Sequence, residues 1–469
     1  ELICYDTDRS GIHGKALEIL FPIDVKDVQH AVITSNNIVP RGLGNNIVGG
    51  CVPDNSVVID MKKMNKIVFD KKSESVYAEA GTTVKELNEK LRSISYEFPI
   101  IDEGTVGGLV ALNSVGFMGK YGNIKDWVKE IEFVNGRGEI VNIGKADLSD
   151  VCGMEGTTGI ITKVKLKIIP LTKKSASIFQ TENIEEVFSV SRRLKIEDEV
   201  IMLRLYSPYV SVLLGFPEKY HLIIGFDSER GKIKNEEYKE LINKIKKDYY
   251  YLSSKGFYNN SDPKLFFDKV KEFVIFLNRL KIPYFVDLHN SIIFPFFNKK
   301  ESSISKEVER HKKEEVLKLT NRMNGVPGKY GIGLKRKNLV DKLRKKVLYR
   351  VKSRHDPFWK INKGKIIDFE DSSTDNKEIY KINGDVQLKS KEIDKKIIEG
   401  NSFNNKFKEQ DNIPSENNEF ESDNSVKKNP DKRGKISDND KDIISRIMLN
   451  KFGEKEEGSK KDKNESRRA

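Results

Sequence analysis

The sequence lacks several features that identify particular classes of protein. It has no apolar run approaching the ~18 residues that a membrane-spanning helix needs, so we expect at most peripheral contact with a membrane. Its three cysteines, Cys4, Cys51 and Cys152, lie far apart without a CxxC pair, which argues against a disulfide scaffold, a zinc ribbon and an iron–sulfur site. No basic-then-apolar leader follows Glu1, so we predict no signal peptide. A reducing, cytoplasmic location fits these observations best.

The 469 residues are polar for a globular protein, with 37% hydrophobic and 33% charged positions. This composition allows a sizeable core but not one compact globule throughout, so we predict two domains and a disordered part. Residues 368–469 are rich in Asn, Ser, Lys, Asp and Glu and nearly lack aromatic and branched apolar side chains. We therefore predict a disordered C-terminal tail over this range.

The net charge of +13 and the isoelectric point of about 9.2 raise the question of nucleic-acid binding. The basic residues alternate with acidic ones, as between Lys306 and Lys318, which is typical of solvated helix faces. No motif of stacking aromatic residues accompanies them. We therefore predict no nucleic-acid partner.

The first 172 residues show a mixed pattern of helices and strands. Thr83 and Glu86 form a capping box before a run of apolar residues at helical spacing. The range 133–141, with Asn135-Gly136 at its centre, predicts a β-hairpin. Between residues 163 and 168, lysines alternate with branched apolar residues, as in a strand with one wet face. The fold class predicted here is α+β.

Residues 173–345 predict a second domain, in which glycine is rarer. Glu236–Tyr251 has apolar residues on one helical face, and the runs Val200–Leu214, His221–Phe226 and Tyr284–Phe297 resemble strands. We expect a mixed, antiparallel sheet with helices on one side.

Glycine is concentrated in one quarter of the chain, since 17 of the 33 glycines lie between Gly42 and Gly159. In VPRGLGNNIVGG, Val39–Gly50, the glycines let backbone N–H groups converge on an anion, and Arg41 adds positive charge, so a diphosphate is a natural ligand. Four residues separate Gly44 from Gly49, so the GxGxxG fingerprint of a Rossmann fold is absent. By itself, the loop fits a tight turn between two strands equally well.

Two more glycine clusters strengthen the ligand interpretation. One runs from Gly104 to Gly122, and another from Gly153 to Gly159 leads directly into a predicted strand. Three such loops in one domain imply one long ligand, with a diphosphate in the middle and ring systems at both ends. FAD fits that description.

These motifs resemble the FAD-binding PCMH-type flavoproteins, related to vanillyl-alcohol oxidase and p-cresol methylhydroxylase, and within them the branch of the glycolate oxidase flavin subunit and D-lactate dehydrogenase. RGLGNNIVGG resembles the RGxGTxxxGG diphosphate loop, and GTVGGLVALNSVG and DLSDVCGMEGTTGIITKVKLKIIP resemble the second and third flavin segments. GKYGIGLKRK and DPFWKINKGKI resemble the EHGIGxxK and DPxxxxNPGK segments. The resemblance implies a two-part FAD-binding domain over 1–172, an α+β cap or substrate domain with an antiparallel sheet over 173–345, and a segment, 346–367, that returns to the flavin.

The resemblance also implies which residues contact FAD. At the diphosphate it places Arg41, Gly42, Leu43, Gly44, Asn45 and Asn46. Along the ribityl chain and isoalloxazine it places Gly104, Thr105, Gly107, Gly108, Asn113 and Gly116. At the adenosine end it places Glu155, Gly156, Gly159 and Ile161, with Asn362 closing over the flavin. Asn45 and Asn46 stand where the family has Thr and Gly, so a side-chain hydrogen bond to phosphate is expected to change.

For the substrate, the resemblance implies that a 2-hydroxy acid or related alcohol gives a hydride to flavin N5. The branch uses three histidines, in GHxGDGNxH and EHG segments, to hold a divalent metal. Here Asp287 and Phe294 stand at two of those positions, and Lys329-Tyr330 replaces Glu-His, so we predict no bound metal.

Three residues remain as candidates for the chemistry. His289 is a candidate base, since an imidazole titrates near pH 6.5. Tyr330 could donate a hydrogen bond to a substrate oxygen, and Lys329, like Lys335 or Arg336, could hold a carboxylate or phosphate or equally face water.

Two functions follow from this reading. The first is an FAD-dependent oxidoreductase that passes electrons to a quinone, a protein carrier or oxygen. The second is a non-catalytic or auxiliary FAD-binding subunit of a larger oxidoreductase complex, in which intact FAD loops would persist beside an altered metal site.

Overall fold

The computed structural model describes residues 2–298 and 303–368, which fall within one unit of the chain, Glu1–Lys377. The tail predicted over 368–469 lies outside these residues except for Asp368. The domain boundaries expected after residues 172 and 345 stay predictions.

The N-terminal part contains a small parallel sheet in the order β1-β3-β2. Its strands and the helix that follows β1 are β1 (Lys15–Leu20), α1 (Val25–Thr34), β2 (Ile38–Arg41) and β3 (Asp54–Asp60). Short 3-10 turns, η1 (Leu2–Tyr5) and η2 (Met61–Lys63), precede and follow this sheet. The C-terminal segment joins its edge, because Ile38 N donates to Lys360 O (2.8 Å) and Asn362 N donates to Ile38 O (2.7 Å). Residues from the two ends of the described chain therefore meet beside β2.

A five-stranded antiparallel sheet in the order β4-β5-β9-β7-β8 follows. Its strands are β4 (Ile67–Asp70), β5 (Ser75–Glu79), β7 (Val128–Asn135), β8 (Ile140–Ile143) and β9 (Gly159–Lys167). The helices α2 (Val84–Arg92) and α3 (Val106–Leu112) share one apolar core with this sheet and α1. Its linking segments contain η3 (Gly119–Tyr121), η4 (Ile124–Trp127), η5 (Leu148–Asp150) and the strand pair β6 (Tyr96–Glu97) and β10 (Ile169–Pro170).

A seven-stranded sheet in the order β14-β11-β13-β12-β16-β17-β15 forms the rest, and all of its pairings are antiparallel. Its strands are β11 (Ser175–Thr181), β12 (Val200–Tyr206), β13 (Tyr220–Phe226), β14 (Ile233–Lys234), β15 (Phe257–Asn259), β16 (Tyr284–Asp287) and β17 (Ile292–Asn298). The helices of this part and of the C-terminal segment are α4 (Ile184–Leu194), α5 (Pro208–Leu213), α6 (Asn235–Ser254), α7 (Phe267–Arg279), α8 (Ser303–Arg322) and α9 (Lys342–His355), with η6 (Lys337–Leu339) before α9. The predicted mixture of helices and antiparallel sheet is confirmed.

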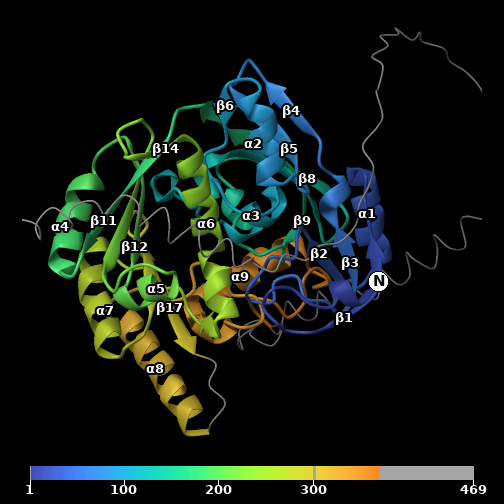
Figure 1. Ribbon diagram of the computed structural model, residues 1–469. Helices are drawn as coiled ribbons and strands as arrows, with labels where there is room; N and C mark the ends of the chain where they lie inside the picture. Colours follow the sequence, from blue (N-terminus) through green and yellow to red (C-terminus); the bar gives the residue numbers. More distant parts are fainter. Residues whose placement is uncertain (1, 299–302, 369–469) are drawn as a thin grey trace, which may run out of the picture. The chain divides into compact units, whose positions relative to one another are not determined.

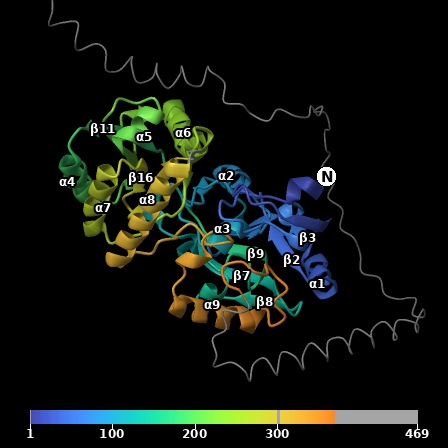
Figure 2. The same ribbon diagram turned by 90° about the horizontal axis from the view of Figure 1, so that it is seen from below.

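Helices cover both faces of the seven-stranded sheet, which corrects the expectation of helices on one side. One core contains β12 residues such as Leu203 together with α4, α7 and α8, which lie next to one another in both views (Figures 1 and 2). The other core contains Ile201 of β12 together with Leu241 and Ile245 of α6. The reason is visible in β12, all of whose residues are buried, so that neither face of the strand is left to water.

Several local predictions are confirmed. The capping box of Thr83 and Glu86 begins α2, the hairpin pairs β7 with β8, and the alternating strand is β9. The range Val200–Leu214 is corrected, because the strand ends at Tyr206 and α5 follows. Ser207 accepts from Val210 N at 3.3 Å and Pro208 occupies the first turn, which together are a helix-start signal.

None of the helices in the described part of the chain is long and apolar enough to cross a membrane.

Candidate functional site

One cavity is lined by all three glycine clusters and, opposite them, by residues of β12, α6, β16 and β17. The sequence-predicted residues that line it are Arg41, Gly42, Leu43, Gly44, Asn45, Asn46, Gly104, Thr105, Gly107, Gly108, Gly116, Glu155, Gly156, Gly159, Ile161, Tyr330 and Asn362. Asn113, His289 and Lys329 do not line it. We call the two sides the glycine wall and the cap wall.

The first glycine cluster begins where β2 ends, at Arg41. Its guanidinium is anchored by the N-terminal segment, since Nη1 donates to Thr7 O at 2.9 Å and the group lies over the Tyr5 ring. A Cβ on Gly42 would lie 2.5 Å from Thr105 Oγ1, and Gly44 has a φ of 70°. Only glycine therefore allows the first and second clusters to approach this closely.

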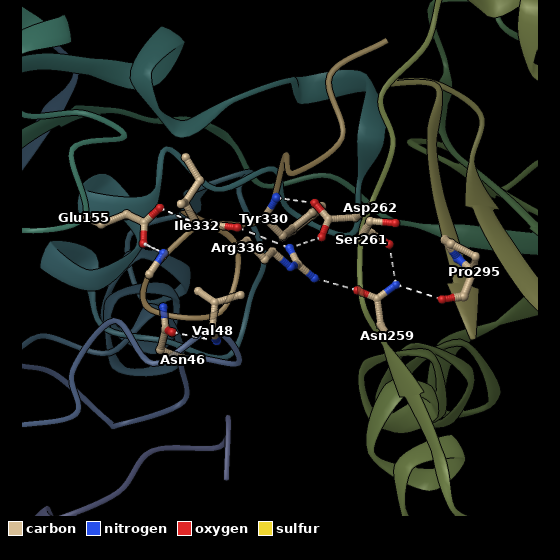
Figure 3. Close-up of polar contacts among 12 residues, drawn as sticks. Asn46, Val48, Glu155, Asn259, Ser261, Asp262, Pro295, Tyr330, Ile332 and Arg336 are labelled. Carbon is tan, nitrogen blue, oxygen red and sulfur yellow. Dashed lines mark hydrogen bonds and ion pairs between the residues drawn. The ribbon is translucent and has the colours of Figure 1, made fainter. Parts of the chain in front are cut away.

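The two asparagines of this loop shape the backbone. Asn46 Oδ1 accepts from Val48 N at 2.9 Å (Figure 3). It also accepts from Gly50 N at 2.7 Å. Asn45 Nδ2 donates to Glu103 O at 3.1 Å, which ties the first cluster to the second. The Asn46 side chain therefore holds the backbone of the first glycine cluster in a closed loop, and the Asn45 side chain connects this loop to the second cluster.

The second cluster leads into α3, which packs closely on β5. Thr105 caps the helix by accepting from Gly108 N at 3.2 Å. Gly107 N donates to Ala80 O at 2.9 Å, and a Cβ on Gly107 would lie 2.7 Å from Ala80 Cβ. Asn113 ends the helix in the left-handed conformation and accepts from Lys125 N at 3.2 Å, which turns its side chain toward the protein.

The third cluster is locked by Glu155 and Asn362. The buried Glu155 carboxylate accepts from Ile332 N at 2.6 Å and from Gly333 N at 2.9 Å (Figure 3). Burial raises the pKa of Glu155, although these two donors oppose the shift. Asn362 Nδ2 donates to Glu155 O at 2.8 Å and to Gly50 O at 3.2 Å. The C-terminal segment thus joins the first and third clusters.

The cap wall carries a buried charged group that the sequence analysis missed. Arg204 of β12 donates from Nη2 to Asp248 Oδ2 of α6 at 2.6 Å, and Tyr206 donates to the same oxygen at 2.8 Å. Burial acts to lower the pKa of Arg204, but the neighbouring Asp248 and Tyr206 raise it by more. The pKa is therefore raised overall, and the guanidinium stays charged. The sequence contained two signals for this pair. One is a lone arginine in the apolar run VIMLRLY, and the other is Asp248, which lies at helical spacing from Leu241, Ile245 and Leu252.

Aromatic rings complete the cap wall. The Arg204 guanidinium lies 3.9 Å from the Phe285 ring centroid, Phe285 lies 4.5 Å from Phe294, and Phe294 lies 5.2 Å from Tyr330. The Tyr330 hydroxyl donates to Val115 O at 2.9 Å. The arrangement presents an aromatic surface around the Arg204–Asp248 pair.

The other two candidates for the chemistry, His289 and Lys329, are half-buried and lie outside the cavity. Burial, with Lys195 and Lys120 nearby, lowers the pKa of His289 to about 4, so its ring is neutral at pH 7. Burial also lowers the pKa of Lys329 to about 8, and its ammonium lies 3.4 Å from Asn113 O.

The two further cations considered for a substrate anion hold the segment 330–336 in place. Arg336 pairs with the buried Asp262, and also donates to Asn259 Oδ1 at 2.7 Å (Figure 3). Lys335 donates to Ser10 O. Neither lines the cavity.

The described residues contain no group of three or more His, Cys, Asp or Glu side chains placed to hold a metal ion. The glycine wall, by contrast, fits a long anionic cofactor. Three close-packed loops face one cavity there, and Arg41 supplies positive charge beside the first of them.

Residues 17–144 match the protein family described as FAD binding domain. A D-lactate dehydrogenase of Anaerostipes hadrus is 34% identical over 202 residues, which is 38% of this chain and 42% of that protein. The glycolate oxidase subunit GlcD of Bacillus subtilis is 30% identical over 165 residues, which is 32% of this chain and 35% of that protein. A D-arabinono-1,4-lactone oxidase of Kluyveromyces lactis is 27% identical over 158 residues, covering 31% of this chain and 30% of that protein.

The chain therefore aligns with less than half the length of these curated relatives. The matches confirm the resemblance that the glycine motifs predicted. The family match ends before the third glycine cluster and before the strands of the cap wall.

Proposed function

Residues 17–144 match an FAD binding domain, and FAD is the cofactor; from this premise we propose that the chain is an FAD-dependent oxidoreductase that acts on a hydroxy acid or a related alcohol. One observation carries the proposal. Three glycine clusters and a cap wall of large side chains face the same cavity, so a cofactor on one side and a small substrate on the other would meet within it.

The proposed organisation follows the sequence analysis. Residues 1–172 form a two-part FAD-binding domain, residues 173–345 form the cap or substrate domain, and residues 346–367 return to the flavin. Two features support this division: the separate apolar core around β5, β7 and β9, and the hydrogen bonds from Asn362 to Glu155 and Gly50. A cytoplasmic location is proposed from the scarcity of cysteine.

On the glycine wall, we assign the diphosphate to the loop from Arg41 to Asn46, through its main-chain N–H groups and the anchored guanidinium of Arg41. The range Gly104–Gly108 and Gly116 would line the ribityl chain and the isoalloxazine. Glu155, Gly156, Gly159 and Ile161 would border the adenosine end, and Asn362 would close over the flavin. Asn113 supports this wall as the C-cap of α3.

When bound, FAD supplies a hydride acceptor at N5. The chain must then orient the alcohol, exclude water and take the hydroxyl proton while the carbinol carbon loses its hydride and becomes a carbonyl. The rings of Phe285, Phe294 and Tyr330 exclude water, and Arg204 orients the substrate oxygen. Asp287, a buried carboxylate that lines the cavity at a position where the family has histidine, is the proposed proton acceptor.

Tyr330 stays in this proposal as a group that contacts the substrate. His289 and Lys329 enter it only as positioning residues, since neither lines the cavity. His289 N donates to Asp287 Oδ1 at 3.0 Å, and so helps to fix that carboxylate.

The test begins with the visible spectrum of the purified protein, or of the apoprotein after incubation with FAD. We expect a flavin spectrum that hydroxy acids or related alcohols bleach under nitrogen. A preparation that stays colourless in excess FAD would refute the proposal. Reoxidation by a quinone, by a protein carrier or by oxygen then identifies the class of electron acceptor.

A second function is favoured by one specific observation, the replacement of the family's histidines by Asp287, Phe294 and Tyr330. An auxiliary FAD-binding subunit would keep the glycine wall and lose the catalytic groups. It would bind FAD with the same spectrum, but no alcohol or hydroxy acid would bleach it, and the protein would copurify with a partner subunit.

A further inference from the structure

The cation at the centre of the cap wall is already neutralised. Arg204 is 8% exposed and Asp248 is 4% exposed, and they lie 2.6 Å apart with Tyr206 donating to the same carboxylate oxygen. A buried ion pair of this geometry carries no net charge for a ligand to use.

The cations that could have held a substrate carboxylate are engaged elsewhere. Arg336 pairs with Asp262, Lys335 donates to Ser10 O, and Lys329 lies against Asn113 O outside the cavity. Lys246 does line the cavity, but it interacts electrostatically with Glu103 and Asp102, which line the same end.

Carboxylates outnumber cations at this end of the cavity. Asp102, Glu103, Asp248 and Asp287 line it, against Arg204 and Lys246, and Arg9 pairs with Glu103 at 4.0 Å from outside the lining. The Asp287 carboxylate accepts hydrogen bonds from His289 N and from Asn290 N and Nδ2, all uncharged donors. A substrate carboxylate would enter a buried site whose net charge is already negative, and both desolvation and repulsion oppose it.

The remaining surface is apolar and aromatic, because the rings of Phe285, Phe294 and Tyr330 pack against one another in tilted contacts across the wall. Such a surface, in which the guanidinium is already paired with a carboxylate, suits an uncharged ligand that is largely apolar.

We propose that the substrate is an uncharged alcohol rather than a hydroxy acid, because the buried guanidinium on the cap wall, that of Arg204, is already paired with Asp248. This rests on the proposed function, because it assumes that the cap wall is the substrate side of the FAD cavity. It narrows the substrate class and assigns Arg204 and Asp248 to its selection.

The test compares ligands that differ in charge but hardly in shape. Mandelamide and mandelate share a phenyl body and a carbinol carbon, as lactamide and lactate share a methyl body. Binding to the oxidised FAD-loaded protein is measured by the perturbation of the flavin spectrum, with rapid mixing under nitrogen if the flavin is reduced. We expect each amide to bind at least about tenfold more tightly than its acid, a difference of ~1.4 kcal/mol. Equal or tighter binding of the acids, or binding of neither, overturns the inference.

A variant sharpens the result. Asp248→Asn keeps the side-chain volume but leaves Arg204 without its counter-charge, so mandelate binding should strengthen at least about tenfold relative to mandelamide. Asp268→Asn, which removes an exposed charge at the start of α7, is the control and should leave the preference unchanged. An unchanged preference in Asp248→Asn contradicts the role assigned to Arg204, and the wild-type comparison stands even if this variant fails to fold.

The two proposals fail differently. A protein that binds no FAD, or whose flavin no ligand reduces although the amides bind, refutes the oxidoreductase function. A protein whose flavin is reduced by mandelate or lactate but not by the amides supports the oxidoreductase function and refutes the uncharged substrate.

Discussion

The two walls of the cavity are built on different principles. The glycine wall consists of short loops whose small residues bring main-chain groups close together, as where Gly42 approaches Thr105. The cap wall consists of large side chains that come from strands and helices far apart in the chain, as Arg204 and Asp248 do. A wall made of backbone leaves a local motif in the sequence, whereas a wall made of side chains is assembled only by the fold. The following predictions test this difference, from the largest expected effect to the smallest.

The stability of the glycine wall should depend strongly on the buried ammonium of Lys352, which connects this wall to the C-terminal segment. Lys352 is 1% exposed and donates to Thr157 O, Asp356 Oδ2 and Ile361 O. Lys352→Met would leave the Asp356 carboxylate buried without its counter-charge, so we expect the free energy of unfolding to fall by about 3–5 kcal/mol. Urea denaturation of the FAD-loaded protein measures this.

The matched control is Lys342→Met, which removes an exposed lysine from the first turn of the same helix, α9. It should change the free energy of unfolding by less than about 0.5 kcal/mol. A loss below about 1 kcal/mol in Lys352→Met would mean that the buried pair does not support the wall.

The close approach of the first two glycine clusters should be needed for the cofactor. In Gly42→Val the added side chain meets Thr105, the N-cap of α3, so one of the two clusters must move. We expect FAD to bind about 100-fold more weakly, which is ~2.7 kcal/mol. Titration of the apoprotein with FAD, followed by flavin fluorescence, measures the dissociation constant.

Gly144→Val is the control for this substitution, because no heavy atom lies within 4 Å of a Cβ at that glycine. Its FAD affinity should match that of the wild type. Similar losses in both variants would show that the effect is not specific to the contact with Thr105.

Asp102, which lines the cavity, should make the free energy of unfolding depend on pH. Burial raises its pKa to about 6, above the ordinary value of 3.8. The folded state therefore binds the proton of Asp102 more tightly than the unfolded state does. This proton binding stabilises the folded state below pH ~4, and the stabilisation is lost as the pH rises through ~6. Asp102→Asn removes the titration, and we expect it to be more stable than the wild type by about 1–3 kcal/mol at pH 7, with no difference at pH 4.

Urea denaturation across this pH range, with Asp268→Asn as the control for loss of one acidic charge, measures the difference. An Asp102→Asn variant whose stability runs parallel to that of the wild type between pH 4 and pH 7 would show that this carboxyl does not titrate as its burial implies.

The smallest effect is expected at Asn45. Its side-chain amide donates one neutral hydrogen bond to Glu103 O, so Asn45→Ala should weaken FAD binding by about 0.5–1.5 kcal/mol, up to roughly tenfold. Asn45→Asp keeps the shape but turns the donor into an acceptor facing that carbonyl, and should cost at least as much. An Asn45→Asp variant that binds FAD better than Asn45→Ala would contradict the role of this hydrogen bond.

How far the sequence predicts this molecule depends on how local each signal is. The capping box at Thr83, the hairpin after Phe133 and the glycine clusters are each readable within a few residues, and the structure contains them. Asn46 was expected to matter through phosphate, yet its side chain folds back on Val48 and Gly50, because a nearby backbone donor is available whether or not a ligand is bound. That contact depends on loop geometry, which residue type alone does not specify.

The cap wall was much less predictable. His289 was chosen for its chemistry, but the turn after β16 directs it away from the cavity and leaves Asp287 and Phe294 there. Arg204 was overlooked because its partner, Asp248, lies on a helix that pairs with β12 only through the tertiary fold. Predicting such a pair requires knowing which face of the sheet α6 covers.

The hydrogen bond from Asn362 to Gly50 joins residues 312 positions apart, and it closes a wall that is otherwise made from the first third of the chain. During synthesis the glycine loops leave the ribosome long before the residue that fastens them. A nascent chain must therefore carry an incomplete glycine wall until residue 362 has been translated, and we expect FAD capture to be one of the last events in its maturation.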